Sequence, residues 1–304
     1  MKILVTGGTT FVSRFTAEYF VKKGDEVFVL NRNTKPQSEG VTLIEADRHD
    51  AGALLKGLHF DAVLDITAYN EHDIRAFVPA LGAFDTYIMI SSSAVYPDTA
   101  PQPFKEDGET GENRFWGRYG TDKIAAERAL HELVPNAYIL RPPYLCGEMD
   151  NVYREAFVFE CALRERKFYL PGDGEMKLQF FDVLDLCRVM DSIIEKRPTR
   201  RVFNVGNRDA VTVREWVTLC YAAAGKTPQF ISVGKEHFQR AYFPFYDYEY
   251  YLDVTAQQEL IGGTMELEES MKRAFAWYVE NKEKVAVKPL FEYIDKEIEN
   301  AQHN

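Results

Sequence analysis

The alternation of short apolar runs with amphipathic segments constrains the fold of this chain more than any other feature. The runs expected to form strands are Lys2–Val5, Glu26–Leu30, Val41–Glu45, Ala62–Asp65, Tyr87–Ile90, Tyr138–Leu140 and Val202–Val205. The segments expected to form helices are Phe11–Lys23, Asn70–Leu81, Trp116–Leu133 and Val183–Lys196. Strands that alternate with helices build a parallel sheet covered on both faces. With right-handed crossovers, the pattern predicts an α/β fold with a doubly wound parallel sheet of the Rossmann type, whose ligands lie at the carboxyl ends of the strands.

The pattern loosens after Gly147. We expect a helix over 152–166, short strands over 168–170 and 178–181, and then an irregular region. Its aromatic stretch, 242–251, is interpreted as core packing, with stacking on a sugar or base as the alternative. The polar residues 298–304 are expected to fray. We interpret the second half as a smaller C-terminal α+β substrate lid. The predicted division assigns residues 1–148 plus about 178–209 to the nucleotide-binding domain and about 149–177 plus 210–304 to the substrate domain.

Charge and composition exclude several function classes. The 47 acidic and 36 basic side chains give a net charge of −11, which disfavours nucleic acid as a partner. No apolar run reaches the roughly 20 residues that span a bilayer, and the first residues lack a signal peptide's apolar stretch, so we expect a cytoplasmic protein with no membrane partner. The four cysteines are widely spaced, which predicts buried thiols and no metal site.

A glycine turn follows the first strand. Its sequence, Thr6-Gly7-Gly8-Thr9-Thr10-Phe11-Val12, leads directly into a helix, and glycines there let the backbone approach a pyrophosphate. The alternative is an ordinary strand–turn–helix corner. At the end of the second strand stand the neutral Asn31 and the basic Arg32. An acidic residue at this place would bind the ribose of NAD, so the pair leans towards NADP, unless Arg32 lies on a solvated loop.

Tyr119 and Lys123 are spaced i, i+4, which places both side chains on one face of a helix. An ammonium roughly 4 Å from a phenol, at an effective dielectric constant of about 20, favours the phenolate by about 4 kcal/mol. We therefore expect Lys123 to bring the Tyr119 pKa towards neutral pH. A match of this spacing is often only a surface pair. Here it follows a strand that ends in a serine run, in which Ser92 can donate to the same substrate oxygen or serve as a turn or cap.

Taken together, the motifs resemble the extended short-chain dehydrogenase/reductases, the NAD-dependent epimerase/dehydratase family. The markers are TGGTTF (6–11), ADRHD (46–50), DAVLDITAY (61–69), ISSSAVY (90–96), YGTDK (119–123), RPPYLCG (141–147), FFDVLDL (180–186) and FNVG (203–206). The combination is most similar to a branch that includes chloroplast stem-loop RNA-binding proteins and bacterial sugar-epimerase-like reductases. The resemblance covers most of the chain and implies an NAD(P)-dependent enzyme that acts on a sugar or sugar-nucleotide.

The resemblance also implies roles for single residues. Tyr119 would be the general acid or base, Lys123 would also hold the nicotinamide ribose, and Ser92 would orient the substrate. Implied contacts to the cofactor are Gly7, Thr9, Thr10, Phe11, Val12, Asn31, Arg32, Asp47, Arg48, Ile66, Thr67, Ala68, Ser91, Tyr119, Lys123, Pro142 and Tyr144. Candidate contacts to the substrate are Tyr69, Ser93, Asn151, Arg154, Gln179 and Arg240. Asp47, by adenine in this scheme, is as easily a turn or helix-start residue.

This sequence departs from the family pattern in several places. The family has glycines where Thr10 and Ser13 stand here, and an arginine near the place of Leu178 and Gln179. Arg240, Arg154 and Lys177 are candidates to meet a diphosphate instead, or are solvated surface charges. The positions of the usual Asp-Glu pair of dehydratases hold Ser93 and Ala94, which favours epimerisation or simple reduction.

Two function classes therefore remain. The first is hydride chemistry on a secondary hydroxyl or ketone, with Tyr119 moving the proton. The second is a catalytically weak dinucleotide-fold protein with an RNA-binding or regulatory role. The family resemblance also implies a possible homodimer through the segments Asn70–Leu81 and Trp116–Leu133.

Overall fold

The fold was analysed in a computed structural model, which describes residues 1–299. The chain forms two compact units. The first comprises residues 1–145, 181–208 and 251–264, and the second comprises the described residues of 146–180, 209–250 and 265–304.

The first unit contains the predicted parallel sheet. Its seven strands lie in the order β11-β6-β5-β4-β1-β2-β3, and every neighbouring pair is parallel. The bounds are β1 Lys2–Thr6, β2 Glu26–Asn31, β3 Val41–Glu45, β4 His59–Asp65, β5 Ala83–Ile90, β6 Tyr138–Arg141 and β11 Val202–Asn204. These are the seven runs expected from the sequence, so the doubly wound α/β prediction is confirmed. The strand order reverses between β1 and β4, and such a switch point is where this architecture binds ligands.

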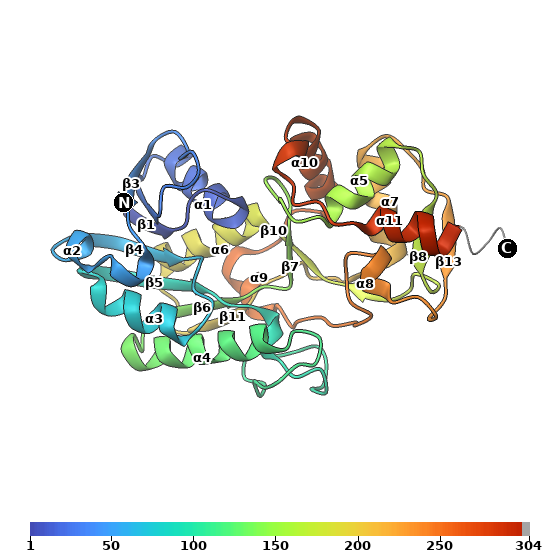
Figure 1. Cartoon of the computed structure of the whole chain (residues 1–304). Coiled ribbons are helices and arrows are strands. Elements are labelled where there is room, and N and C mark those ends of the chain that lie inside the picture. The colour runs from blue at the N-terminus through green and yellow to red at the C-terminus, as the bar shows by residue number, and fades with distance from the viewer. Residues whose placement is uncertain (300–304) are drawn as a thin grey trace. The chain divides into compact units, whose positions relative to one another are not determined.

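Helices cover both faces of the sheet (Figure 1). α3 (Glu71–Phe77) packs with α4 (Arg118–Leu133), and α1 (Phe11–Lys22) packs with α6 (Val183–Lys196). Smaller elements of this unit are α2 Gly52–Leu55, α9 Thr255–Ile261 and the 3-10 turns η1 Arg48–Asp50, η2 Val78–Ala80 and η3 Ser93–Val95. Strands β7 Tyr144–Cys146 and β10 Phe180–Asp182 lie where the chain passes between the units in sequence.

The observed helix starts follow from capping chemistry. Asn70, expected inside a helix, is the N-cap of α3 and forms a capping box with Asp73. The segment 70–81 is therefore a short α-helix followed by η2, and Pro79 stands at the start of that 3-10 turn. The predicted helix over 116–133 begins at Arg118, after Gly117 with φ +51°.

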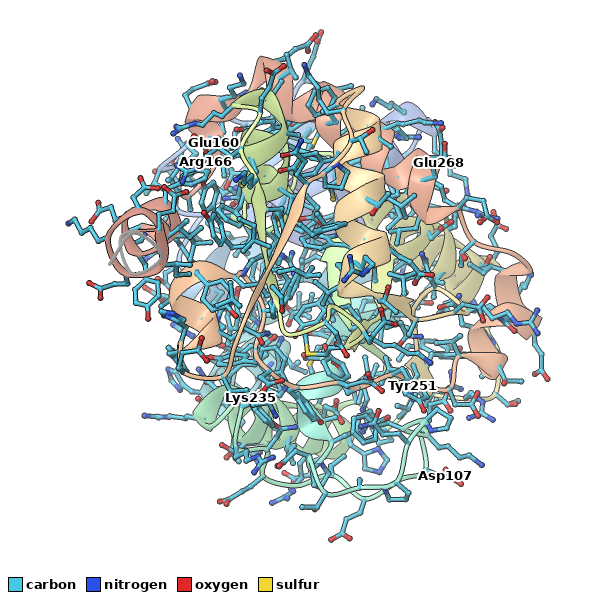
Figure 2. All side chains as sticks on the ribbon, turned by 90° about the vertical axis from the view of Figure 1, so that its right-hand side faces the viewer. Asp107, Glu160, Arg166, Lys235, Tyr251 and Glu268 are labelled. Carbon is cyan, nitrogen blue, oxygen red and sulfur yellow. The ribbon has the colours of Figure 1, made fainter. Side chains whose placement is uncertain are left out.

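The second unit is more regular than the sequence suggested. Its elements are α5 Glu155–Leu163, β8 Phe168–Pro171, β9 Lys177–Leu178, β12 Val211–Thr212, α7 Val213–Ala223, β13 Phe230–Val233, α8 Gln239–Tyr242, α10 Leu267–Glu280, η4 Lys282–Lys284, α11 Leu290–Tyr293 and η5 Ile294–Glu299. The side chains of this unit are seen in Figure 2, where Glu160 and Arg166 lie close together near the end of α5.

Several expectations for this unit are wrong. The helix expected over 152–166 is confined to α5, and the strand expected over 178–181 is broken at Gln179 into β9 and β10. The region after 206, expected to be irregular, contains α7, which begins with a capping box between Thr212 and Glu215. Its buried side chains recur at helical spacing, namely Val213, Trp216, Val217, Cys220 and Tyr221.

Two further expectations concern packing and the chain end. The aromatic stretch does form core, because Tyr242, Phe243, Phe245, Tyr248 and Tyr250 are all buried. Fraying from residue 298 is wrong for its first residues, since Ile298 lies in the last helical segment and is 3% exposed. Residues 300–304 lie outside the described residues.

Candidate active site

The glycine turn after β1 has a backbone that only glycine adopts readily. Gly7 and Gly8 have φ of 91° and 92°. A Cβ on Gly7 would lie 2.8 Å from the Ser13 hydroxyl oxygen, and one on Gly8 would lie 2.5 Å from a methyl of Val29. Ser13 therefore fits where the family has glycine because Gly7 has no side chain to meet it.

The turn leads into the N-terminus of α1. Thr10 is the N-cap, with extended backbone, and within residues 1–299 its side chain makes no capping hydrogen bond. Ser13 Oγ instead donates to the Thr10 carbonyl at 3.0 Å. The first N–H groups of a helix carry partial positive charge and need acceptors, so this end of a twelve-residue helix can receive an anion such as a pyrophosphate.

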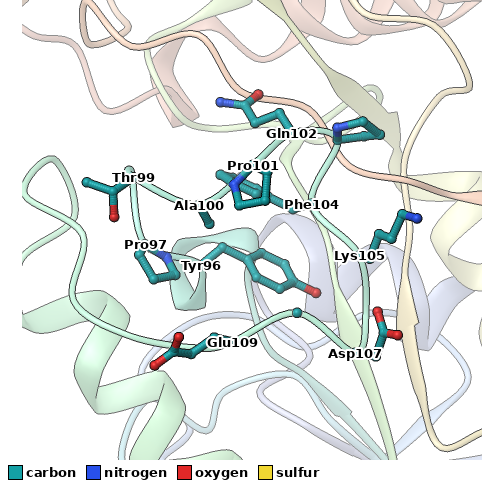
Figure 3. A pocket seen from close by; sticks show the side chains of 12 residues that line it. Tyr96, Pro97, Thr99, Ala100, Pro101, Gln102, Phe104, Lys105, Asp107 and Glu109 are labelled. Carbon is teal, nitrogen blue, oxygen red and sulfur yellow. The ribbon is translucent and has the colours of Figure 1, made fainter.

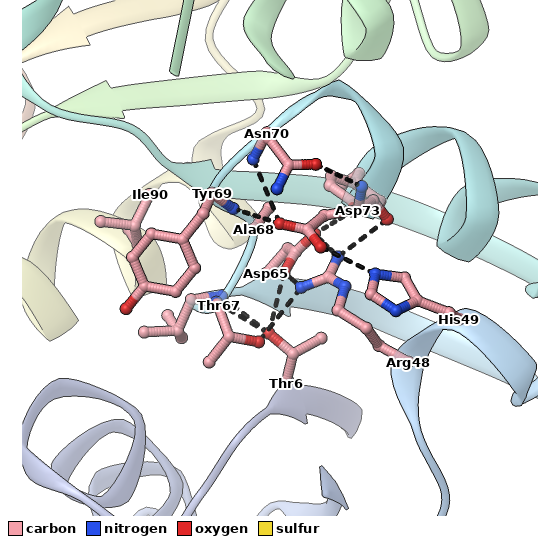
Figure 4. Close-up of polar contacts among 12 residues, drawn as sticks. Thr6, Arg48, His49, Asp65, Thr67, Ala68, Tyr69, Asn70, Asp73 and Ile90 are labelled. Atoms are coloured by element: carbon pink, nitrogen blue, oxygen red, sulfur yellow. Dashed lines mark hydrogen bonds and ion pairs between the residues drawn. The ribbon is translucent and has the colours of Figure 1, made fainter. Parts of the chain in front are cut away.

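A buried ionic network supports the turn that follows β4 (Figure 4). Thr6 Oγ1 accepts hydrogen bonds from the backbone N–H of Ile66 at 2.9 Å and of Thr67 at 3.1 Å, and donates to Asp65 at 2.8 Å. Asp65 is fully buried and pairs with Arg48, whose Nη atoms lie 3.0 and 2.8 Å from its two oxygens. The network therefore fixes Ile66 and Thr67 beside the glycine turn.

The charge state of Asp65 follows from these contacts. Burial by itself would raise its pKa, but the charge of Arg48 and hydrogen bonds from Arg48, Tyr87 and Thr6 outweigh burial and lower the pKa. Sequence reasoning missed Asp65, although an aspartate that ends an apolar strand run was a usable signal. Arg48, expected to touch a cofactor, directs its guanidinium at Asp65, at Thr67 Oγ1 and at the Asp73 carbonyl.

The structure also locates the residues expected near the adenine ribose. Asn31 Nδ2 donates to the Gly7 carbonyl at 2.7 Å and to the side chain of Gln37 at 3.0 Å. Arg32 is exposed. Asp47 accepts from the His49 N–H at 2.9 Å and is the N-cap of η1, which agrees with its interpretation as a helix-start residue. Asn31 is thus held against the glycine turn.

Lys123 lies at the carboxyl ends of β4 and β5. Its ammonium donates to the Ala68 carbonyl at 2.6 Å and to the Ile90 carbonyl at 2.9 Å, and the residue is 3% exposed. Nζ is 5.0 Å from the ring centroid of Tyr69 and 6.0 Å from that of Tyr119. The lysine is therefore held beneath two phenol rings, both of which are partly exposed.

The pKa values correct one expectation. Burial lowers the pKa of Lys123 to about 8, opposed by the charges of Asp65 and Glu127. The pKa of Tyr119 is raised, first by desolvation and also by Tyr69, while a hydrogen bond with Ser92 lowers it. The prediction that Lys123 brings the Tyr119 pKa towards neutral pH is wrong for the protein by itself. The physical reason is that the ammonium is turned to two backbone carbonyls, while desolvation of the phenol group dominates even though the tyrosine residue as a whole is partly exposed.

The three serines of the run, Ser91, Ser92 and Ser93, form different hydrogen bonds. Ser92 Oγ accepts from the Ala94 N–H at 3.1 Å, which makes it the N-cap of η3 as well as a partner of Tyr119. Ser91 is buried and donates to Glu127 on α4. The backbone N–H of Ser93 donates to the Pro142 carbonyl at 2.9 Å. Ser92 is thus joined to the Tyr119 phenol.

The remaining candidates of the first unit lie around these groups. Phe11 has φ of +33°, and Val12 follows it in the first turn of α1. Thr9 lies in the turn before it. Tyr144 is buried, and its ring centroid is 6.0 Å from that of Trp116.

The second unit holds the other candidates for substrate contacts. Arg154 is largely buried and its Nη2 lies 2.9 Å from Asp150, so its interpretation as a solvated surface charge is wrong. Gln179 is 1% exposed, and the Asn151 carbonyl accepts from the Ala286 N–H at 2.9 Å. The guanidinium of Arg240 lies 4.7 Å from the ring centroid of Tyr246.

Sequence reasoning also missed a pocket in the first unit (Figure 3). Its volume is about 690 Å³, and its lining residues all come from 96–109, a segment rich in proline. The rings of Tyr96 and Phe104 stack at 5.0 Å beside it. Three prolines in this segment, Pro97, Pro101 and Pro103, were a signal in the sequence that could have predicted a rigid loop here.

Fold and site together define a dinucleotide-fold protein with a Tyr-Lys pair at the strand ends. The chain belongs to the NAD dependent epimerase/dehydratase family, whose model matches residues 3–82 and 76–206. The four cysteines are buried, as predicted. No group of three or more His, Cys, Asp or Glu side chains in the described part of the chain could hold a metal, and no helix there is long and apolar enough to cross a membrane.

Relatives and solved structures agree with this assignment. The chain is 24% identical over 285 residues to the chloroplast stem-loop binding protein of 41 kDa b of Arabidopsis thaliana, covering 86% of this chain and 74% of that protein. It is 24% identical to a UDP-glucose 4-epimerase of Corynebacterium glutamicum, covering 74% of this chain and 81% of that protein. The fold is similar to a UDP-glucose 4-epimerase of Thermotoga maritima solved with UDP-glucose, with 20% identity, a TM-score of 0.74, and coverage of 93% and 100%. A UDP-glucuronic acid 4-epimerase of Bacillus cereus, solved with UDP-glucuronic acid and NAD, has 18% identity, a TM-score of 0.72, and coverage of 92% and 99%.

Proposed function

We propose that the protein is an NAD-dependent epimerase that acts on a secondary hydroxyl of a sugar or sugar-nucleotide. One observation carries this proposal: the ammonium of Lys123 is held at the ends of β4 and β5 beneath the rings of Tyr69 and Tyr119, and Ser92 is bonded to the Tyr119 phenol. A proton-transfer group, a cation and a hydroxyl thereby converge where doubly wound sheets bind ligands.

The first unit has a cradle that fits a dinucleotide. Gly7 and Gly8 leave space that a Cβ would fill, and the N-terminus of α1 can receive the pyrophosphate. Asn31 would face the adenine ribose. These residues would hold the NAD, and a bound NAD would supply the hydride acceptor and donor for the substrate carbon. Solved neighbours of this fold contain NAD, and none of these comparisons supports the lean towards NADP.

The residues of the chain would handle the proton. Since the pKa of Tyr119 is raised, its phenol is protonated in the protein by itself and can donate to a ketone oxygen. In the opposite direction Tyr119 would first have to lose its own proton, because only the phenolate can take up the hydroxyl proton, and the positive charge of Lys123 would stabilise that phenolate. Ser92 would hold the same substrate oxygen. Ser93 and Ala94 are buried and offer no carboxyl group for dehydration. We therefore propose that the reaction is an epimerisation rather than a dehydration.

Calorimetry with NAD, NADP and a panel of UDP- and dTDP-sugars tests this proposal, followed by turnover of whichever sugar binds. We expect NAD to bind below millimolar concentration. Tyr119→Phe should keep NAD binding and lower kcat by about 10² to 10⁴, because it removes the proton-transfer group without changing the ring. Unchanged turnover in this variant would remove Tyr119 from the mechanism.

The stem-loop-binding relative supports a second candidate, a catalytically weak RNA-binding protein. The net charge of −11 opposes it, because phosphate backbones are repelled by an acidic surface. Titration with an RNA stem-loop at two salt concentrations separates the two candidates: micromolar RNA binding without NAD binding would favour the second. A homodimer through α3 and α4 stays a prediction, which size-exclusion chromatography with light scattering checks.

A further inference from the structure

Helix α4 carries a buried carboxylate on the face that bears the Tyr-Lys pair. Glu127 stands one helical turn after Lys123 and two turns after Tyr119. Its side chain is 9% exposed. A carboxylate at this depth is unfavourable unless charged partners and hydrogen bonds compensate for the lost water. Neither the sequence motifs nor the proposed proton transfer accounts for it.

The partners of Glu127 lie at the carboxyl ends of two neighbouring strands, β5 and β6. Arg141, the last residue of β6, donates to Oε1 from Nε at 3.0 Å and to Oε2 from Nη2 at 2.6 Å. Ser91, which directly follows β5, donates to the same Oε1. One carboxylate therefore joins α4 to the ends of both strands, and Ser91 is the chain neighbour of Ser92.

Arg141 extends the connection to the segment that lines the pocket. Its Nη1 donates to the Tyr96 hydroxyl at 2.8 Å and to the Glu106 carbonyl at 3.3 Å. The Tyr96 hydroxyl in turn donates to Asn204 on β11 at 2.7 Å. Tyr96 lies at the base of the pocket in Figure 3 and is 1% exposed. The guanidinium is thus held from both sides, which leaves the Glu127 carboxylate little freedom to move.

We propose that Glu127 is a positioning residue for the Tyr119–Lys123 pair: its carboxylate fixes α4 against the ends of β5 and β6, and its charge keeps the Lys123 ammonium protonated. This inference rests on the proposed function, because it assigns Glu127 to the same site. It adds a separate claim, that Glu127, one helical turn further along α4, contributes to the electrostatics of the pair.

The charges around Lys123 support the second part of the proposal. Burial is the main influence and lowers its pKa to about 8, while Glu127 is one of the charges that oppose burial. The other charged groups that act on it are Asp65 on β4 and Asp73 on α3, which raise the pKa, and Arg48 on η1, which lowers it. Loss of the Glu127 charge would also leave Arg141 without its counter-ion. Residues one turn apart on a helix face lie about 5–6 Å apart at Cβ, and at an effective dielectric constant of about 40 one charge at such a distance shifts a pKa by on the order of one unit.

Three variants separate positioning and charge from mere stability. Glu127→Gln removes the charge with little change of shape. The double variant Glu127→Met with Arg141→Met replaces the ion pair by apolar side chains, a change that folded proteins commonly tolerate, and it tests the positioning claim if the first variant does not fold. Glu132→Gln is the matched control: it removes one negative charge from the same helix at an exposed pair with Arg75.

The readout is the titration of Lys123, followed by ¹³C NMR of lysine Cε and assigned by the signal lost in Lys123→Met. We expect the midpoint to fall by about one pH unit in Glu127→Gln, to fall less in the double variant because Arg141→Met removes a positive charge at the same time, and to stay in place in Glu132→Gln. In turnover assays, the alkaline limb of kcat should move by the same amount while KM for NAD changes less than twofold. A folded Glu127→Gln variant that titrates like the original protein would overturn the claim about charge, and a folded double variant with unchanged kcat would overturn the claim about positioning. The titration needs no turnover, so a shifted midpoint in a protein without activity would refute the proposed function alone.

Discussion

Replacing Asp65 by asparagine tests how the strand-end turn is held. Asp65 is fully buried and accepts hydrogen bonds from Arg48, Thr6 and Tyr87, the last at 2.6 Å. Asparagine keeps the shape but leaves the Arg48 guanidinium, whose side chain is 11% exposed, without its counter-ion. Breaking a buried pair in this way costs about 3–5 kcal/mol. At roughly 2–4 °C per kcal/mol, the transition of the first unit should fall by about 6–20 °C.

The loss of stability caused by Asp65→Asn should depend on pH. The folded-state pKa of Asp65 lies below its ordinary value, so its stabilising contribution is fully present above about pH 4 and is lost as pH falls through the folded pKa. The difference between Asp65→Asn and the original protein should therefore be full at pH 7 and shrink below pH 4. Thermal unfolding followed by circular dichroism at several pH values measures it.

Two variants make the result interpretable. Asp85→Asn, on the neighbouring strand β5, removes a carboxylate that is 41% exposed and pairs with His59, so it should cost less than about 1 kcal/mol. Arg48→Met combined with Asp65→Asn should recover part of the loss, because no charge is then left buried alone. If Asp65→Asn melts within 1–2 °C of the original protein, roughly the shift of the surface control, the reasoning about the network is wrong.

Three further predictions concern single positions. Gly7→Ala should weaken NAD binding, measured by calorimetry, more than tenfold, because φ is 91° and the new Cβ would lie 2.8 Å from Ser13 Oγ. Adding Ser13→Ala should restore only part of the affinity, because it removes the contact but not the unfavourable φ. The pKa of Lys123 is lowered to about 8, so between about pH 8 and pH 10 the unfolded chain binds more protons than the folded chain. The free energy of unfolding should therefore rise with pH over this range, and Lys123→Met should remove the rise when unfolding by urea is measured at several pH values. Trp216→Ala should destabilise the second unit by about 3–5 kcal/mol, since Trp216 is fully buried and stacked on Phe180 at 5.5 Å; its urea midpoint measures the loss, and an unchanged midpoint would contradict the packing argument.

The sequence by itself determined the first unit and the order of its motifs. The spacing of apolar residues along the chain reflects which side chains each element buries. For this reason the sequence predicted the exact bounds of the strand Val41–Glu45 and of the helix Val183–Lys196. The second unit was predicted less well, because its density of aromatic residues hid the helical spacing of α7. Helix boundaries also differed where a cap such as Asn70 decides them.

The tertiary structure decided the charges and partners of the site. Spacing alone places Tyr119 and Lys123 on one face of α4, but it cannot show that the lysine is turned to the Ala68 and Ile90 carbonyls or that burial raises the Tyr119 pKa. The Arg48–Asp65 pair joins residues 17 positions apart, as part of a network that also includes Thr6 and Tyr87. Such long-range contacts depend on which strand ends meet, and desolvation depends on everything packed around a group. The local sequence pattern encodes neither the long-range contacts nor the desolvation of a group. The pairs that set the pKa values could therefore be identified only in the folded chain.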